Sequence, residues 1–262
     1  MLLIVFLCQS CSSGNKRIES INFTSNLGYV VQGEGRPSVI FEANFGDSHE
    51  VWTPVLQKIS KVTKVFAYTR NFGSSGSSKD GFTKTLTSYE IALNLRKRLK
   101  SNAVEPPFVI VAHSYAGLYA LKFAELYPKD TAGVVLVDGR PAEFSSSCQQ
   151  LKLGNCTTPY LIQSLQAPKD QQEIRGLPET ESITPSGQKL GALPVTVITA
   201  TVPSKTRTRE YQEHWIRSQE EFARSLKNGK LVTALGAGHN IHRSRPDLVV
   251  KEIKDLISRL DL

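Results

Sequence analysis

Long apolar runs, nucleotide-binding signatures and metal-binding cysteine clusters are all missing from the sequence. The apolar stretch MLLIVFLC at the amino terminus is too short to span a bilayer as a stable helix. Neither Gly-Lys-Ser/Thr nor G-x-G-x-x-G occurs, so the glycine-rich segment at 70–82 gives little support for a nucleotide-phosphate site. No His or Cys lies near Cys148 and Cys156 to complete a four-ligand zinc set. These absences argue against a membrane-spanning, nucleotide-binding or zinc-binding domain.

Acidic residues are in the minority, and the formal net charge is +8. The basic residues are nevertheless scattered, and the densest group, Arg96-Lys97-Arg98 with Lys100, falls on the outer face of a predicted helix. Aromatic residues that could stack on bases are not interleaved with this group. We therefore expect a solvated helix face there and no nucleic-acid partner.

Residues 1–16 form an apolar run followed by Cys11 and small polar residues, an order that resembles the centre and tail of an export signal. The nearest resemblance is to a bacterial lipoprotein signal, with Cys11 as the candidate lipid-bearing cysteine. This implies an exported protein held at a membrane by a lipid anchor, and the alternative is a cytoplasmic protein with an unprocessed amino terminus. Cys148 and Cys156 then form either a local disulfide in an oxidising compartment or two free thiols.

From Arg17 onward, short apolar runs alternate with amphipathic segments, one of which places Ile91, Leu95 and Leu99 on one helix face. This repeated order predicts a mostly parallel sheet of eight strands with right-handed crossovers and helices on both faces, in one domain over residues 17–262. The predicted strands are 17–23, 29–33, 37–43, 63–69, 107–112, 132–138, 194–200 and 230–235, and the first two form a hairpin. The predicted helices are 48–60, 88–100, 115–127, 209–226 and 246–260.

The alternation stops between Gly139 and Leu193, where polar residues, prolines and glycines dominate and only 159–166 has a weak helical pattern. So long an interruption inside a compact fold is typical of a lid or binding insertion. We expect it to roof a site, with Tyr160, Leu161 and Leu165 as candidate lining residues.

The segment AHSYAG, residues 112–117, joins a predicted buried strand to a predicted helix. Ala112 and Ala116 supply the small residues that a tight turn needs two positions either side of Ser114. Such a turn lifts the serine above the sheet edge, and the helix that starts at Tyr115 directs amide groups and its positive dipole end toward negative charge. The pattern predicts a nucleophilic serine, with a serine that only caps the helix as the alternative.

This segment resembles the nucleophile elbow of α/β-hydrolases, usually G-x-S-x-G, with alanines in place of both glycines. The resemblance runs from about Arg17 to the end of the chain, apart from most of the insertion, and includes GVVLVD and GHNIHRSRPDLV. It implies the α/β-hydrolase fold and a histidine base between the last strand and the last helix. His239 has that place and is favoured over His242, while His113 is expected to be a packed structural residue.

The acid that orients the histidine usually follows the strand at 194–200 in this family, but here TVPSKTRTR contains no acid. Some members take the acid from the end of the preceding strand, where Asp138 lies in this sequence. Asp138 is therefore the preferred partner of His239. Glu210 and Glu213, within the following helix, remain alternatives.

Acyl transfer also needs two amide donors for an oxyanion. The resemblance implies the amide of Tyr115 as one donor. The segment VIFEANFGDSHEVW resembles the loop that supplies the other donor, with Phe45 in the donor position and Ala43-Asn44 in place of the family's His-Gly pair. An asparagine at 44 tolerates a positive φ better than most residues.

These residues predict a serine hydrolase that cleaves a carboxylic ester or related small-molecule acyl substrate through an acyl-enzyme, with no metal or organic cofactor implied. Acyl-chain length, the choice between ester, amide and lactone, and the oligomeric state stay open. The alternative is a non-catalytic α/β-hydrolase-fold protein that binds a ligand or partner beneath the insertion, which the altered Ala43-Asn44 pair supports. A pure binder has no need of both Ser114 and His239, so the enzyme is favoured.

Overall fold

A single twisted sheet forms the centre of the protein in the computed structural model, which describes residues 28–70, 85–154, 156–157, 168–204 and 207–260. The described strands are ordered β1-β3-β2-β4-β5-β6-β7 in one seven-stranded sheet, in which β1 alone pairs antiparallel with its neighbour. The strands are β1 (Tyr29–Gln32), β2 (Ser38–Glu42), β3 (Val65–Tyr68), β4 (Phe108–His113), β5 (Thr131–Val137), β6 (Val195–Ala200) and β7 (Gly229–Ala234). The remaining predicted strand, 17–23, which comes first in the sequence, lies outside the described residues.

The central strands are apolar along their whole length because both faces of the sheet are covered. Every residue of β2, β4 and β6 is buried, whereas the edge strand β7 alternates exposed and half-buried positions. The register pairs His113 with Val137 and Val137 with Ile198. The carboxyl ends of β4, β5 and β6 therefore meet at one edge of the sheet, where the predicted site residues follow them.

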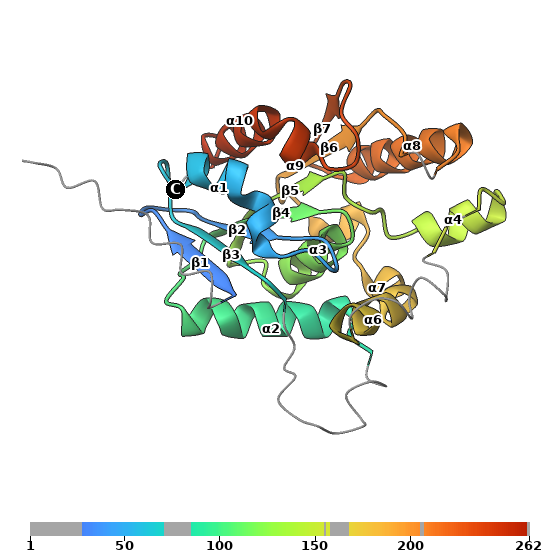
Figure 1. Cartoon of the computed structure of the whole chain (residues 1–262). Helices are drawn as coiled ribbons and strands as arrows, with labels where there is room; N and C mark the ends of the chain where they lie inside the picture. Colours follow the sequence, from blue (N-terminus) through green and yellow to red (C-terminus); the bar gives the residue numbers. More distant parts are fainter. Residues whose placement is uncertain (1–27, 71–84, 155, 158–167, 205–206, 261–262) are drawn as a thin grey trace, which may run out of the picture.

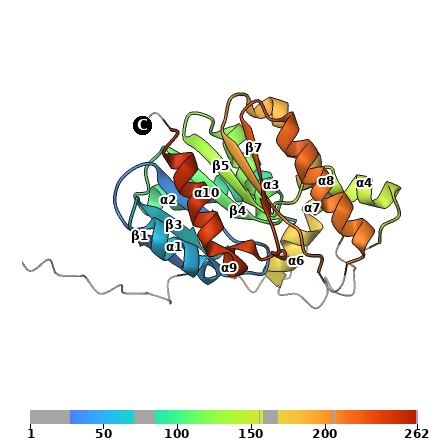
Figure 2. The same ribbon diagram turned by 90° about the horizontal axis from the view of Figure 1, so that it is seen from above.

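Helices cover both faces of the sheet (Figures 1 and 2), α1 and α10 on one side and α2 and α3 on the other. Helix α8 packs beside β6 and β7. The helices outside the insertion are η1 (His49–Trp52), α1 (Thr53–Ile59), α2 (Ser88–Ser101), α3 (Ala116–Leu126), α8 (Arg209–Ser225), α9 (Ile241–Ser244) and α10 (Pro246–Ile257). The mostly parallel sheet with helices on both faces confirms the predicted architecture.

Helix α2 shows how local sequence and core packing agree. Thr87 and Glu90 form a capping box at its amino terminus, which satisfies amide groups that the helix itself leaves unbonded. Ile91, Leu95 and Leu99 are buried against the sheet, as their spacing predicts. Burial of each such side chain contributes about 1.5–3 kcal/mol.

The insertion contains more helix than the sequence pattern indicates. It forms α4 (Phe144–Gln150), α6 (Pro168–Arg175), α7 (Leu177–Ile183) and the 3₁₀ turn η3 (Gly187–Leu190). Helices this short are marginal by themselves and depend on tertiary contacts, so they leave little periodic signal in the sequence. The segment 159–166, with Tyr160, Leu161 and Leu165, lies outside the described residues, as does the leader 1–16. Across the described ranges, no helix combines the length and hydrophobicity needed to cross a membrane.

Candidate active site

Ser114 occupies a strained turn between β4 and α3. Its φ is +57°, in the left-handed region that non-glycine residues seldom adopt. The turn is held from several directions, because Ser114 N–H donates to the Val137 carbonyl at 3.2 Å and the Ser114 carbonyl accepts from Gly117 at 3.0 Å and from Arg140 at 2.9 Å. This strand-turn-helix geometry is the one that the AHSYAG segment predicts.

The small residues around Ser114 allow α3 to lie close to the end of β5. Ala112 and Ala116 are fully buried. A Cβ atom on Gly117 would lie 3.3 Å from Leu136 Cδ2 and 3.5 Å from Gly139 Cα. Helix α3 therefore lies close to the backbone that follows β5. Larger side chains would push α3 away from the strand end and alter the turn that contains Ser114.

His239 and Asp138 lie side by side, although 101 residues separate them. His239 Nδ1 is 2.6 Å from Asp138 Oδ2. The side chain of Asp138 is 2% exposed and that of His239 is 25% exposed, so the acid is sealed while the imidazole still reaches the surface. The arrangement suits an imidazole whose second nitrogen exchanges protons with a substrate-bound group.

Asp138 is anchored by α8 as well as by the sheet. Its Oδ1 accepts hydrogen bonds, each 3.0 Å long, from Ala200 N–H, Trp215 Nε1–H and Gln219 Nε2–H. Burial raises the pKa of Asp138, but the hydrogen bond and charge of His239, together with these donors, outweigh it and lower the pKa below its ordinary value. Asp138 is therefore a carboxylate at neutral pH.

Two other histidines support the loop that presents His239. His113, one residue before Ser114, is buried, and its Nε2–H donates to the His239 carbonyl at 3.0 Å, which links that loop to the elbow. His242 is buried between His113 and Trp52, with ring centroids 4.5 and 4.7 Å away. Neither of its ring nitrogens has a hydrogen-bond partner among the described residues. Burial lowers the pKa of His242 to about 3, so it is a neutral packing residue and a poor candidate for the base.

The predicted oxyanion residues also come together. The rings of Phe45 and Tyr115 meet edge to face with centroids 4.8 Å apart. The Phe45 loop turns at Gly46, whose φ is +78°, and Asp47 N–H closes the turn on the Asn44 carbonyl at 3.2 Å. The left-handed residue in this loop is thus Gly46, which follows Phe45, and the tolerance of Asn44 for a positive φ is not used.

The glutamates that compete with Asp138 lie on the solvent side of α8. Glu210 is exposed, and Glu213 pairs with the exposed Arg209 at 2.8 Å. Trp215 and Gln219, one turn apart on the opposite face of α8, are the residues that reach Asp138. Their spacing of four on an amphipathic helix was the available sequence signal for a shared partner.

A buried ion network joins the carboxyl end of β2 and the loop that follows it to the insertion, and it has no local signature in the sequence. Arg70, which follows β3, donates to Glu42 at 3.0 Å and makes a two-pronged contact with Glu173 of α6 at 3.0 and 3.1 Å. The same guanidinium donates to the Ala43 carbonyl at 2.5 Å. Glu173 lies 103 residues from Arg70, so only the fold brings them together.

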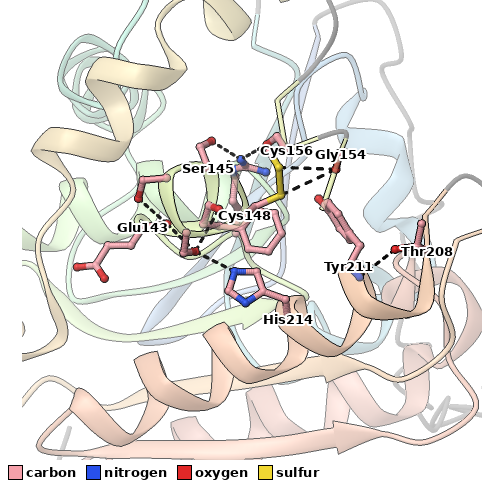
Figure 3. The surroundings of a disulfide bond; sticks show 12 residues. Glu143, Ser145, Cys148, Gly154, Cys156, Thr208, Tyr211 and His214 are labelled. Atoms are coloured by element: carbon pink, nitrogen blue, oxygen red, sulfur yellow. Dashed lines mark hydrogen bonds between the residues drawn. A yellow bond between two sulfur atoms is a disulfide. The ribbon is translucent and has the colours of Figure 1, made fainter. Parts of the chain in front are cut away.

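A disulfide closes a short loop within the insertion, and Arg140 joins that loop to the turn that contains Ser114. Cys148 and Cys156 are bonded, which selects the disulfide from the two interpretations that the sequence left open. Figure 3 shows this bond, which joins Cys148 of α4 to Cys156, near Ser145 and Tyr211. Arg140, which the sequence did not single out, donates to the Cys156 carbonyl at 2.8 Å and to Ser145 Oγ at 2.6 Å.

Among the described residues, metal-ligating side chains do not gather at this site. The part of the chain that the structure describes contains no group of three or more His, Cys, Asp or Glu side chains arranged to hold a metal ion. The polar groups at the strand ends instead include the pair of Asp138 and His239. Ser114 follows His113, whose ring contacts the His239 carbonyl at 3.0 Å.

Comparisons with known proteins agree with this arrangement. A model described as "Alpha/beta hydrolase family" matches residues 44–252. The chain is 25% identical over 233 residues to the uncharacterized protein YqjL of Bacillus subtilis, covering 86% of this chain and 85% of that one.

Solved structures share the fold at low sequence identity. A thermophilic esterase from Thermogutta terrifontis aligns with a TM-score of 0.65 at 17% identity, covering 88% of this chain and 92% of that one. The enol-lactonase from Burkholderia xenovorans aligns with a TM-score of 0.60 at 16% identity, covering 88% and 96%.

Proposed function

Because the chain belongs to the alpha/beta hydrolase family, we propose that it is a serine hydrolase that cleaves carboxylic esters through an acyl-enzyme. The observation that carries the proposal is the 2.6 Å contact between His239 Nδ1 and a fully anchored, ionised Asp138 at the strand ends. A binding protein of this fold gains nothing from an imidazole hydrogen-bonded to a buried carboxylate at the sheet edge where a strained serine also lies. Acyl transfer needs a serine nucleophile and an oriented imidazole base together.

In the proposed reaction, Ser114 is the nucleophile. Its Oγ attacks the carbonyl carbon of the ester and its proton passes to Nε2 of His239. Asp138 accepts the hydrogen bond from Nδ1–H, which keeps Nε2 free to accept that proton and then stabilises the imidazolium. His239 returns the proton to the leaving alcohol, and a water molecule activated in the same way hydrolyses the acyl-enzyme.

The tetrahedral intermediate needs donors for its oxyanion, and we assign that role to the amides of Phe45 and Tyr115. The contact between their two rings supports the assignment, because it holds the two loops that carry these amides against each other. Gly46 supports it as well, since the left-handed turn directly after Phe45 sets the direction of that backbone segment. Each preorganised donor of this kind lowers the activation barrier by about 2.7–4 kcal/mol in serine hydrolases.

A carboxylic ester or lactone is the substrate class we favour. The structural neighbours include proteins named as an esterase and an enol-lactonase, and both names describe cleavage of an acyl–oxygen bond. We further propose that the insertion 139–193 roofs the site. Helix α6 supports this, because Glu173 holds Arg70 and Asp170 lies against Gly46 of the oxyanion loop.

We also propose that the protein is exported and bears a lipid on Cys11. The Cys148–Cys156 disulfide supports an oxidising compartment, since such bonds seldom persist in a reducing cytosol. Mass spectrometry of the mature amino terminus tests this: a diacylglyceryl adduct on Cys11 is expected, and an unmodified Met1 would contradict it.

Hydrolysis of p-nitrophenyl esters of graded acyl length tests the enzymatic proposal. Wild-type protein should turn over at least the shorter esters, and Ser114→Ala and His239→Gln should each lose about 10⁴-fold or more in kcat. His242→Phe is the control, because it keeps a packed ring without a base, and it should stay within about 10-fold of wild type. Loss of activity in His242→Phe but not in His239→Gln would overturn the assignment of the base.

A further inference from the structure

We propose that Arg140 is a positioning residue for the Ser114–Tyr115 turn, and that the disulfide-closed loop Cys148–Cys156 holds it in place. The inference rests on the proposed function and extends it to a support on the insertion side of the site. Arg140 touches none of the groups proposed to react.

Arg140 contacts the turn in two ways. Its backbone N–H donates at 2.9 Å to the carbonyl of Ser114, the residue whose φ is +57°. Its guanidinium lies over the ring of Tyr115, with Cζ 5.1 Å from the ring centroid. A cation over an aromatic ring contributes more when both are buried, and here Arg140 is 5% and Tyr115 is 7% exposed. The ring of Tyr115, whose backbone amide is a proposed oxyanion donor, thus contacts both Arg140 and Phe45.

The nitrogen atoms of the guanidinium donate hydrogen bonds to other residues of the insertion. Its Nε donates to Glu181 of α7 at 2.7 Å, and its Nη2 donates to Ser145 Oγ and to the Cys156 carbonyl. The disulfide closes the short loop that presents this carbonyl and restricts its freedom. The planar fork of arginine matches these acceptors, and a lysine ammonium cannot reproduce that geometry.

The same loop also packs against the acid side of the site. Cys148 and Cys156 belong to one apolar cluster with Phe144, Tyr211 and Trp215. Trp215 is a donor to Asp138. The disulfide-closed loop Cys148–Cys156 therefore supports two parts of the site. It contacts Arg140, which contacts the Ser114–Tyr115 turn, and it packs against Trp215, which donates to Asp138.

Three variants test the role of Arg140: Arg140→Gln, Arg140→Lys and, as a matched loss of a cation from an exposed site, Arg209→Gln. We expect kcat of Arg140→Gln to fall about 10- to 100-fold with KM changed less than about 3-fold, which is less than the loss on removing an oxyanion donor. Arg140→Lys should keep only part of the wild-type kcat, and Arg209→Gln should keep all of it. Rates are expressed per active site after titration with a fluorophosphonate. A merely structural role lowers the titrated fraction and Tm but leaves kcat per site unchanged, which would overturn the proposal.

The disulfide is tested with Cys148→Ala/Cys156→Ala and with wild type treated with dithiothreitol. In the second case the sulfur–sulfur bond breaks, each cysteine gains one hydrogen, and the dithiol is oxidised to its cyclic disulfide. We expect both to lose about 3- to 10-fold in kcat, because small displacements of positioned groups are costly. The double variant should not respond to dithiothreitol. Full wild-type rates with both thiols shown to be free by mass would contradict the proposal.

Amide hydrogen exchange of residues 112–120 provides a readout that needs no turnover. Exchange there should be faster in Arg140→Gln and in the double cysteine variant than in wild type or Arg209→Gln. Wild-type protein without esterase activity would refute the proposed function. The exchange rates would still test whether Arg140 positions the Ser114–Tyr115 turn. Unchanged exchange in folded Arg140→Gln would refute the positioning role by itself.

Discussion

The variant Asp138→Asn keeps the size of the side chain and removes its negative charge, so it tests the role of the carboxylate apart from packing. The asparagine oxygen can still accept the three hydrogen bonds from Ala200, Trp215 and Gln219 that now end on Oδ1. Its Nδ2 amide then faces His239 Nδ1, which must accept and so loses its proton to Nε2. An imidazole with a proton on Nε2 cannot take the proton of Ser114.

The expected loss follows from that change of tautomer. An exchange of this kind in a serine triad lowers kcat by about 10⁴, which corresponds to about 5.5 kcal/mol in the activation barrier. Folding should suffer far less, because a single weakened hydrogen bond to a charged group costs about 1.5–3 kcal/mol. The kcat for a p-nitrophenyl ester and the urea midpoint, measured on the same preparation, give both quantities.

Glu210→Gln and Glu213→Gln are the matched controls, since each makes the same chemical change on the exposed face of α8. Both should retain kcat within about 2-fold of wild type, because exposed ion pairs contribute at most about 1 kcal/mol. Asp138→Asn with a kcat within 10-fold of wild type would refute the reasoning. A large loss in either glutamate variant would move the acid to α8.

Two further predictions concern stability. Burial lowers the pKa of His113 and of His242 below the ordinary 6.5, to about 3 for His242, so below pH 6.5 the unfolded chain binds protons that the native state does not. As the pH falls from 6.5 toward 3, the free energy of unfolding should therefore fall by about 1.4 kcal/mol per pH unit for His242, and His113 should add to this fall. Urea titrations at pH 7 and pH 5 measure this fall in the free energy of unfolding. The fall should be smaller in His242→Phe, and a fall equal to that of wild type would contradict the assignment of a lowered pKa to His242. Arg70→Met should cost about 3–5 kcal/mol in urea unfolding, because it leaves Glu42 and Glu173 buried without their cation. A cost below about 1 kcal/mol would show that the network is not a buried one.

The sequence predicts the sheet and the positions of Ser114 and Asp138 at the ends of its strands, because both follow from local pattern. Buried parallel strands are continuous apolar runs, and their ends mark where Ser114 and Asp138 must lie. His239 follows from its place after the last strand.

The supports of the site could not be predicted in this way. Arg140 and Glu181 are 41 residues apart, and Arg70 and Glu173 are 103 apart, so no short window of sequence contains either pair. The short helices α4, α6 and α7 depend on such contacts, and their segments therefore lack a helical signal. The left-handed turn at Gly46 could not be located either, because the replacement of the family's His-Gly pair by Ala43-Asn44 leaves the path of this loop undefined by local sequence.

Labelling with a fluorophosphonate probe, followed by peptide mass spectrometry, tests the central claim most directly. A serine activated by His239 and Asp138 reacts with this probe, whereas an ordinary serine does not. The account predicts one adduct, on Ser114, in folded wild-type protein, strong loss of labelling in Asp138→Asn, and none in Ser114→Ala. Folded wild-type protein without an adduct, or with its adduct on another residue, would contradict it.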